Sequence, residues 1–345
     1  MTRILIVSAA AAADAPPDVK VDDVVSELFS CLAFELGYDV SHAAVRTVPE
    51  LERAVRSAHP TIVLNLCETL DGSSRYESLV PVVLERLGVA YTGSPREALR
   101  TCLHKFECND LLRRSGVAVP ISRRVGSGAE LGDFPLPAIV KPDREDGSVG
   151  IDGSSIVHDR DSARARVDAC VAAHAQPAVV QEYIPGREIS VSFVGYPEPR
   201  ALWPGEISFD LALDGGPTIL TYAAKWEPDS IDYVATRPVT AAVDPAIVRR
   251  IVATARRTFS VLGLRDYGRV DLRLDARGEP RVIDVNPNCD LGHEGAFMRA
   301  ARRTGLDRAQ ALSLLVGGAL RRALSPASET LPPKSAATAG GADDP

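Results

Sequence analysis

The side chains most able to do chemistry stand in a predicted hairpin near the C-terminal end, "YGRVDLRLDARGEPRVIDVNPNCDLG". Strict alternation in "RVDLRL" places Arg269 and Asp271 on one face of a strand. The same period places Val282, Asp284 and Asn286 on one face of the next strand. A turn at "DARGEP" then sets the two carboxylates opposite each other, where they repel unless a cation lies between them. Since Mg²⁺ prefers hard oxygen ligands, the hairpin predicts a magnesium site; a solvent-facing polar strand would show the same pattern.

A loop that could hold phosphate groups lies farther upstream. Lys141 ends the apolar run "AIVK", and the loop "EDGSVG" begins four residues later. Gly147 and Gly150 would allow backbone N–H groups to approach an anion closely, and Ser148 offers a hydroxyl. The loop lacks the G-K-[ST] ending of a Walker A motif, and glycine-rich turns are common. The lysine beside it and the dicarboxylate hairpin strengthen its interpretation as a phosphate loop.

The elements that must position these residues begin with an alternating region. Strand-like runs at 3–8 and 61–67 alternate with helical patterns at 21–37 and 76–88. Strands separated by helices imply βαβ units and a mostly parallel sheet, with ligands at the carboxyl ends of the strands. The segment after the first strand, residues 9–18, lacks the G-x-G-x-x-G fingerprint, which disfavours a dinucleotide oxidoreductase.

The pattern changes after about residue 96. "REALRTCLHKFECNDLLRRSGVAVP" is predicted to form one long helix that ends at Gly116. Strand, glycine loop, strand, helix and two further strands follow, a unit that can fold over a nucleotide as a lid. We therefore predict an α/β protein with four regions: an N-terminal substrate domain at 1–98, a lid domain at 99–188, a catalytic domain at 189–325 and a disordered tail at 326–345.

Composition narrows the class of partner. The net charge of −7 argues against nucleic acid or an acidic membrane surface. The apolar runs are too short for a bilayer span, and "RILIV" is too short for a signal peptide. The six scattered cysteines, at 31, 67, 102, 108, 170 and 289, are expected to be free thiols. These features favour a cytoplasmic globular enzyme or binding protein whose partners are small molecules.

Five motifs in order resemble those of the ATP-grasp ligases: "LHKFECNDLLRRSGVAVP", "PAIVKPDREDGSVGI", "QEYIPGREISV", "YAAKWEPDS" and "GRVDLRL…VIDVNPN". The D-alanine–D-alanine ligase group looks nearest, and "LGVAYTGS" is similar to it as well. The resemblance covers roughly residues 60–320. It implies an ATP-grasp architecture, an ATP-dependent carboxylate–amine ligase that forms an acyl phosphate, and a homodimer through the N-terminal domain.

The resemblance also implies site residues. ATP contacts would come from Lys105, Lys141, Gly147, Gln181, Glu182, Tyr183, Ile184 and Glu188. Catalytic roles would fall to Arg269, Lys225 and Ser148, and one or two Mg²⁺ (or Mn²⁺) would bind Asp271, Asp284 and Asn286. The candidate substrate contacts are Glu68, Arg75, Tyr76, Asn288, His293 and Glu294. An exposed loop would equally explain the first three, and capping of the helix that follows would explain His293 and Glu294.

The chain departs from the family chiefly in the substrate half. The Ser-Glu pair that binds the first D-alanine is missing after the first strand, and "NPNCDLGHEGAF" replaces the family's Pro-Gly turn. In the ATP half only two acidic positions change: Asp284 and Gln181 each stand where the family has Glu. We therefore expect a different carboxylate and a different acceptor, as in a dipeptide or secondary-metabolite ligase. A true D-alanine–D-alanine ligase, a non-catalytic ATP sensor and an intramolecular acceptor stay open as alternatives.

Overall fold

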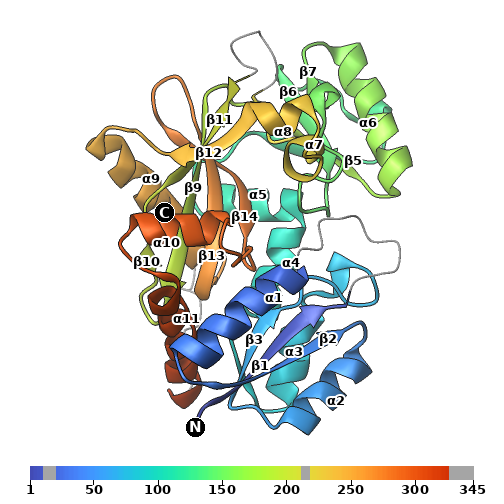
Figure 1. Cartoon of the computed structure of the whole chain (residues 1–345). Helices are drawn as coiled ribbons and strands as arrows, with labels where there is room; N and C mark the ends of the chain where they lie inside the picture. Colours follow the sequence, from blue (N-terminus) through green and yellow to red (C-terminus); the bar gives the residue numbers. More distant parts are fainter. Residues whose placement is uncertain (11–20, 211–217, 326–345) are drawn as a thin grey trace, which may run out of the picture.

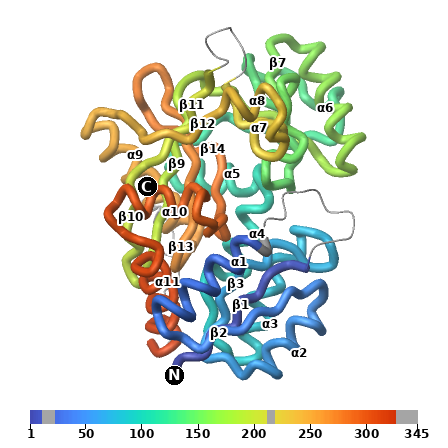
Figure 2. The backbone as a smooth tube through the Cα atoms, viewed as in Figure 1, coloured from blue at the N-terminus to red at the C-terminus, as the bar shows by residue number. Residues whose placement is uncertain are grey.

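The computed structural model describes residues 1–10, 21–210 and 218–325, and these form three sheets with helices around them (Figure 1). The predicted disordered tail at 326–345 and most of the segment after the first strand lie outside the described residues. Figure 2 traces the chain from the N-terminal sheet through two helices into the central sheet and then into the C-terminal sheet. The α/β expectation is confirmed.

The N-terminal sheet is fully parallel, with strand order β2-β1-β3-β4. The short apolar runs form its strands, and the amphipathic segments between them form helices, as the alternation predicted. Its strands are β1 (Arg3–Ala9), β2 (Asp39–Val45), β3 (Ile62–Leu66) and β4 (Ala90–Tyr91). Its helices are α1 (Val21–Ser30), which continues as a π-helical turn (Cys31–Glu35), α2 (Val48–Ala58) and α3 (Leu79–Arg86).

The central sheet is antiparallel, with order β5-β8-β6-β7, and α6 packs on it. Its strands are β5 (Ser122–Val125), β6 (Ala138–Pro142), β7 (Ile156–Val157) and β8 (Ala178–Glu182), and α6 spans Arg160–His174. Asp159 caps α6 by accepting hydrogen bonds from two backbone N–H groups of the first turn.

The single long helix predicted after residue 96 is wrong. The chain forms α4 (Arg96–Leu103) and α5 (Lys105–Arg114), with His104 between them in an extended conformation. Asp143, at the end of the phosphate-loop strand, accounts for the break: its carbonyl accepts from the Lys105 N–H at 2.9 Å, and its carboxylate accepts from the Phe106 N–H at 3.0 Å. Periodicity along one helix cannot reveal a cap supplied by a distant strand.

The C-terminal sheet has the order β12-β11-β9-β13-β14, with β10 on the side of β9. Its strands are β9 (Arg187–Gly195), β10 (Arg200–Ala201), β11 (Gly205–Phe209), β12 (Thr236–Thr240), β13 (Asp266–Leu274) and β14 (Pro280–Asn286). The helices are α7 (Tyr222–Trp226), α8 (Ile231–Ala235), α9 (Pro245–Val261), α10 (Ala296–Arg303) and α11 (Arg308–Leu324).

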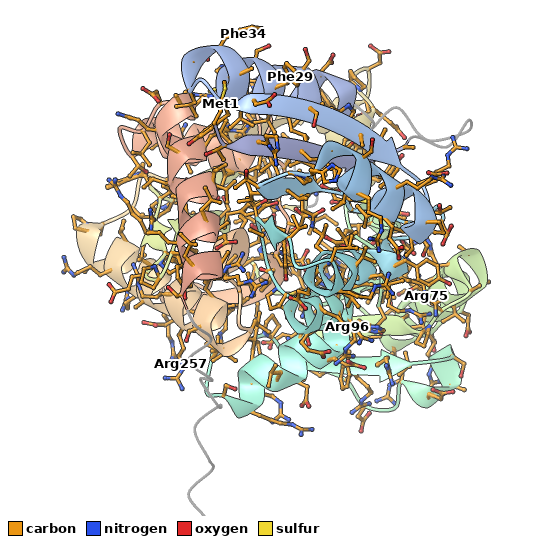
Figure 3. The ribbon with its side chains drawn as sticks, turned by 90° about the horizontal axis from the view of Figure 1, so that it is seen from below. Met1, Phe29, Phe34, Arg75, Arg96 and Arg257 are labelled. Carbon is orange, nitrogen blue, oxygen red and sulfur yellow. The ribbon has the colours of Figure 1, made fainter. Side chains whose placement is uncertain are left out.

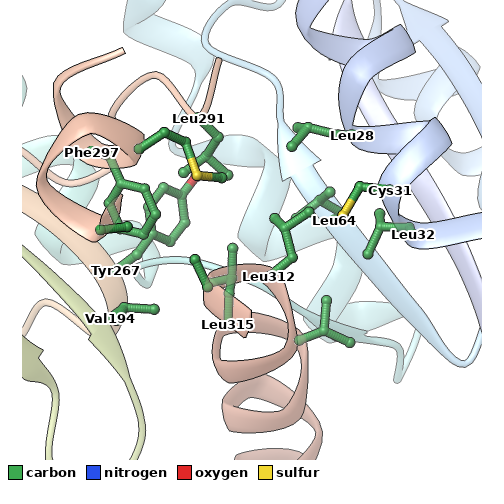
Figure 4. Close-up of a cluster of buried hydrophobic side chains, with 14 of the residues drawn as sticks. Leu28, Cys31, Leu32, Leu64, Val194, Tyr267, Leu291, Phe297, Leu312 and Leu315 are labelled. Atoms are coloured by element: carbon green, nitrogen blue, oxygen red, sulfur yellow. The ribbon is translucent and has the colours of Figure 1, made fainter. Parts of the chain in front are cut away.

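The N-terminal and C-terminal sheets share one hydrophobic core. Figure 4 shows Leu28 and Leu64 from the first sheet region facing Tyr267, Phe297 and Leu312 from the last, all within one buried cluster. Burial of apolar side chains at this contact fixes how the two regions sit relative to each other. The carboxyl ends of the parallel strands therefore face the C-terminal sheet across a cavity.

Candidate active site

A cavity of about 1590 Å³ opens between the three sheets. All of the predicted ATP-binding, catalytic and metal-ligating residues line it, as do Glu68, Arg75, Asn288 and Glu294. Tyr76 and His293 are not among the lining residues. The Tyr76 side chain is exposed, and the His293 ring contacts Arg302 and Arg308 instead. The helix-capping alternative for His293 and Glu294 does not hold, since Gly295 is the N-cap of α10 and no side chain caps it.

The hairpin pairs in the register expected from the sequence. Arg269 lies opposite Asn286, and Asp271 lies opposite Asp284. A bulge between Asp271 and Leu272 shifts the register beyond that point, so Val282 turns into the core and does not share the face of Asp284. The prediction for Val282 is therefore wrong, because simple alternation assumes an unbroken ladder.

Each of the two facing carboxylates has a cationic neighbour within the protein. Arg269 binds both oxygens of Asp271, at 2.8 and 2.9 Å, and Asn286 donates to the same carboxylate at 3.1 Å. Lys105 donates to Asp284 at 3.2 Å. Burial would raise the pKa of Asp284, but Lys105 and Lys141 outweigh it, so the pKa lies below its usual value. Asp284 is thus held in the ionised form that a metal requires.

The two lysines beside the hairpin differ in how far nearby carboxylates neutralise their charge. Burial would lower the pKa of Lys105, but Asp284 and Asp146, both within 3.3 Å, raise it. Among the described residues, Lys141 donates only to the Ile283 carbonyl, at 3.3 Å. Burial, with the charge of Lys105 nearby, lowers its pKa to about 8. A phosphate group bound beside Lys141 would therefore stabilise its charged form.

The glycine-rich loop presents its backbone to the cavity. Gly147, Ser148 and Gly150 all have a positive φ, at 62°, 64° and 75°. Among the described residues, no hydrogen bond reaches the N–H groups of these three positions. Successive free N–H groups in such a turn form a concave site for an anion.

Helix α7 fastens this loop to the C-terminal sheet. Trp226 donates its indole N–H to the Gly147 carbonyl at 2.8 Å, and the Tyr222 N–H donates to the Ile151 carbonyl at 2.8 Å. Figure 1 shows α7 and α8 lying against the central sheet region although they come from the C-terminal part of the chain. The same short helix carries Lys225 into the cavity. Burial and the charge of Arg269 lower the pKa of Lys225.

The other end of the cavity suits a nucleoside. Gln181 is buried at 4% exposure, and Ile184 lines the cavity with its N–H free of hydrogen bonds to described residues. The Tyr183 N–H is already bonded to the Pro137 carbonyl, so Ile184 is the position of the pair that can donate to a base. Glu188 lies 3.7 Å from Arg273, and burial raises its pKa. An acceptor of this kind suits ribose hydroxyls.

Sequence reasoning missed two charged residues of the substrate half. Glu77 is 8% exposed and lines the cavity, and Arg299 of α10 lines it as well. Arg299 forms no hydrogen bond or close ion pair with the described residues, and burial lowers its pKa. Neither residue belongs to a motif, so only its place against the cavity identifies it.

The cavity and its walls define an ATP-grasp ligase: two sheets from different parts of the chain enclose a glycine-rich loop, several lysine and arginine side chains and an acidic hairpin. Comparison with solved structures supports this fold. The D-alanine–D-alanine ligase from Bacillus anthracis in complex with ATP superposes with a TM-score of 0.72 over 94% of this chain and 99% of that one, at 18% identity. The VanG D-Ala:D-Ser ligase from Enterococcus faecalis gives 0.69 over 92% and 99%, at 17% identity.

Sequence comparison identifies the family. Residues 127–317 match the family model described as D-ala D-ala ligase C-terminus. The chain is 35% identical to the uncharacterized protein y4sG of Sinorhizobium fredii over 260 residues, which is 75% of this chain and 73% of that protein. It is 27% identical to the D-alanine–D-alanine ligase of Desulforudis audaxviator over 276 residues, 78% and 82% of the two chains. The chain therefore belongs to the D-alanine–D-alanine ligase family, and it is an ATP-dependent carboxylate–amine ligase.

Two further expectations can be compared with the structure. All six cysteines are free and buried, as expected. Burial raises the pKa of Cys289, which lines the cavity, to about 12, so this thiol is not an activated nucleophile. Within the described ranges, no helix is both long and apolar enough to cross a membrane.

Proposed function

We propose that this ligase activates a substrate carboxylate as an acyl phosphate and transfers it to an amine, and that its substrates differ from a pair of D-alanines. Support comes first from the convergence of Lys141, Lys225 and Arg269 on the Asp271–Asp284 pair in one cavity. Support for a different substrate comes from Glu77 and Arg299, two charged side chains in the substrate half that form no ion pair with a described residue.

The proposed reaction has two steps. A carboxylate oxygen attacks the γ-phosphorus of ATP, the bond to the ADP oxygen breaks, and an acyl phosphate forms. The amine then attacks the acyl carbon, the carbon–oxygen bond to phosphate breaks, and the amine loses a proton. Lys105, Lys141 and the N–H groups of the 145–150 loop hold the phosphates. Lys225 holds the transferred phosphoryl group, and Arg269 stabilises the negative charge that develops on the acyl oxygen.

The residues of the hairpin fit a magnesium ion. Asp271, Asp284 and the Asn286 amide are hard oxygen donors on facing strands of one hairpin. The described residues contain no cluster of three or more Asp, Glu, His or Cys at metal-binding distance, so phosphate oxygens or water must complete the shell. When bound, Mg²⁺ neutralises the charge of the phosphate oxygens. Arg269 and Lys105 then exchange part of their carboxylate contacts for substrate.

The nucleoside end of the cavity receives the remaining proposed contacts. The Ile184 N–H and the Gln181 side chain contact adenine, while Glu182 and Tyr183 shape the pocket around it. Glu188 accepts hydrogen bonds from the ribose. In the substrate half, Glu68, Arg75, Asn288 and Glu294 remain proposed contacts, whereas the structure gives no support for Tyr76 or His293.

Incubation of the purified protein with Mg-ATP and pools of L- and D-amino acids tests the proposal. Released phosphate together with a new mass, from a pool other than D-alanine, is the expected result. D-Alanine alone yielding its dipeptide would disprove the substrate difference while keeping the ligase. Absence of turnover from every pool, with Mg-ATP still bound tightly, would favour an ATP sensor.

The homodimer remains a proposal as well. Seen from below in Figure 3, Phe29 and Phe34 of the first helical segment lie at one edge with Met1 close by. Phe34 is 82% exposed and Met1 is 89% exposed. Exposed apolar side chains of this kind suit a contact between subunits. Light scattering should give twice the mass of one chain, and Phe34→Asp should shift it toward one.

A further inference from the structure

The substrate half of the cavity holds a carboxylate that lacks a cation. Glu77 lies between a short 3₁₀ turn (Ser74–Tyr76) and α3, and its side chain is 8% exposed against the cavity. Among the described residues, no lysine, arginine or histidine forms an ion pair with it. A buried carboxylate without a cation is costly, so it calls for an explanation.

One oxygen of the Glu77 carboxylate accepts a hydrogen bond, and the other has no donor among the described residues. The Asn288 amide N–H donates to Glu77 Oε1 at 2.9 Å. The Tyr267 hydroxyl donates to the Asn288 amide oxygen, which fixes the amide with its NH₂ group toward Glu77. No hydrogen bond from the described residues reaches Oε2. The side chain is thus oriented by a hydrogen-bonded chain that leaves one acceptor for a ligand.

The position of Glu77 ties it to the reaction centre. Asn288 follows Asn286 by two residues, at the end of the hairpin that carries Arg269 and Asp271. A group bound at Glu77 Oε2 therefore occupies the same cavity as Arg269 and Asp271, next to the end of their hairpin. Such a group must be able to donate a hydrogen bond to a carboxylate that has other acidic side chains nearby.

The acidic side chains around Glu77 favour a ligand group with a positive charge. Burial raises the pKa of Glu77, and the acidic side chains of Glu68 and Asp146 raise it further, while the Asn288 hydrogen bond offsets only part of this. A cationic group placed beside Oε2 would reverse the effect. A neutral or anionic group would not.

We propose that Glu77 anchors a primary ammonium group of a substrate, so that the ligase takes a free amino acid or other primary amine and rejects its N-acylated form. This inference rests on the proposed function and deepens it. Neither Glu77 nor Asn288 is one of the proposed metal ligands, and the proposed role of Glu77 is confined to substrate binding. The cavity thereby gains an ammonium site whose carboxylate, Glu77, belongs to no sequence motif.

Binding measured without turnover tests the inference. The wild-type protein is saturated with Mg²⁺ and AMP-PNP and then titrated with pools of free L- and D-amino acids and with the matching N-acetyl pools, by calorimetry and thermal shift. The free-amino pool should bind at least about 10-fold more tightly than its N-acetyl counterpart. Glu77→Gln, which keeps the shape and can still accept from Asn288, should abolish that preference, and Glu77→Asp should retain it.

Two controls keep the outcome interpretable. Glu97→Gln removes the same charge from an exposed position of α4 outside the cavity, and it should leave the preference unchanged. Unaltered AMP-PNP affinity in Glu77→Gln shows that the fold is intact. The inference is overturned if free and N-acetyl pools bind alike, if no free-amino pool binds, or if Glu77→Gln keeps the preference. Failure of the proposed ligase function is a separate outcome: amino acids bind, but Mg-ATP yields no phosphate. If phosphate is released and Glu77→Gln still prefers free over N-acetyl amino acids, only the ammonium site is refuted.

Discussion

The two halves of the cavity handle buried charge in the same physical way but with opposite sign. In the nucleotide half, Lys141 is buried and Lys225 is partly buried, and neither forms an ion pair with a carboxylate of the described residues; burial lowers the pKa of both. In the substrate half, Glu77 is a buried carboxylate that forms no ion pair with a cation of the described residues, and burial raises its pKa. We propose ATP phosphates as the missing partners of the two lysines. By the same argument, we propose that the missing partner of Glu77 is a cationic group of the substrate.

The largest effect is expected at the point where the two halves meet. Arg269→Gln should lower kcat by about 10³-fold, because charge on the acyl oxygen develops mainly in the transition state. The affinity for AMP-PNP should change much less. Phosphate release with an active substrate pool measures the first, and AMP-PNP titration measures the second. An equal loss in both would place Arg269 in the nucleotide half alone.

A second change separates metal-dependent binding from the rest. Asp284→Asn should weaken Mg-ATP binding by about 100-fold, since it removes a proposed metal ligand and the partner of Lys105 at 3.2 Å. The same variant should bind ATP in EDTA about as the wild type does. Calorimetry with and without Mg²⁺ compares the two. Equal losses in both conditions would mean that Asp284 only positions Lys105.

The low pKa of Lys141 predicts a pH dependence of ATP binding. With a pKa of about 8 in the free protein, this lysine is charged below pH 8 and neutral above it. Phosphate binding above pH 8 must therefore be accompanied by uptake of a proton, so affinity falls as the pH rises, by about 10-fold between pH 7 and pH 9. Lys141→Arg, which stays charged, should flatten the profile measured by titration across that range. A wild-type profile that rises with pH would contradict the assignment.

The smallest expected effect concerns the lid. Trp226→Phe removes the 2.8 Å hydrogen bond to the Gly147 carbonyl but keeps the ring that packs beside the loop. If this hydrogen bond contributes about 1 kcal/mol to the ATP-bound position of the loop, its loss should raise the KM for ATP about 5-fold. Binding that depends on Glu77 in the substrate half should not change. Trp203→Phe, at an exposed position away from the cavity, is the matched control. If the two variants raised the KM for ATP equally, Trp226 would have no specific role in holding the loop.

Much of the site could be predicted because its chemistry lies in local motifs. The alternation of β13 and the turn at Gly278 gave the Asp271–Asp284 register, since both depend on neighbouring residues only. The break at His104 and the helix that carries Lys225 could not be predicted, because each depends on contacts with distant strands. Val282 was placed on the wrong face because a bulge interrupts the ladder.

By itself, the sequence determined the alternating strands and helices of the N-terminal region, the Asp271–Asp284 register and the candidates for phosphate and metal binding, since periodicity and turn chemistry act over a few residues. Only the tertiary structure decided which charges remain without a partner. Glu77 and Asn288 are 211 residues apart in the chain and meet at 2.9 Å. Whether a carboxylate is solvated, paired or left for a ligand depends on burial and on neighbours from other elements, and no local pattern encodes either.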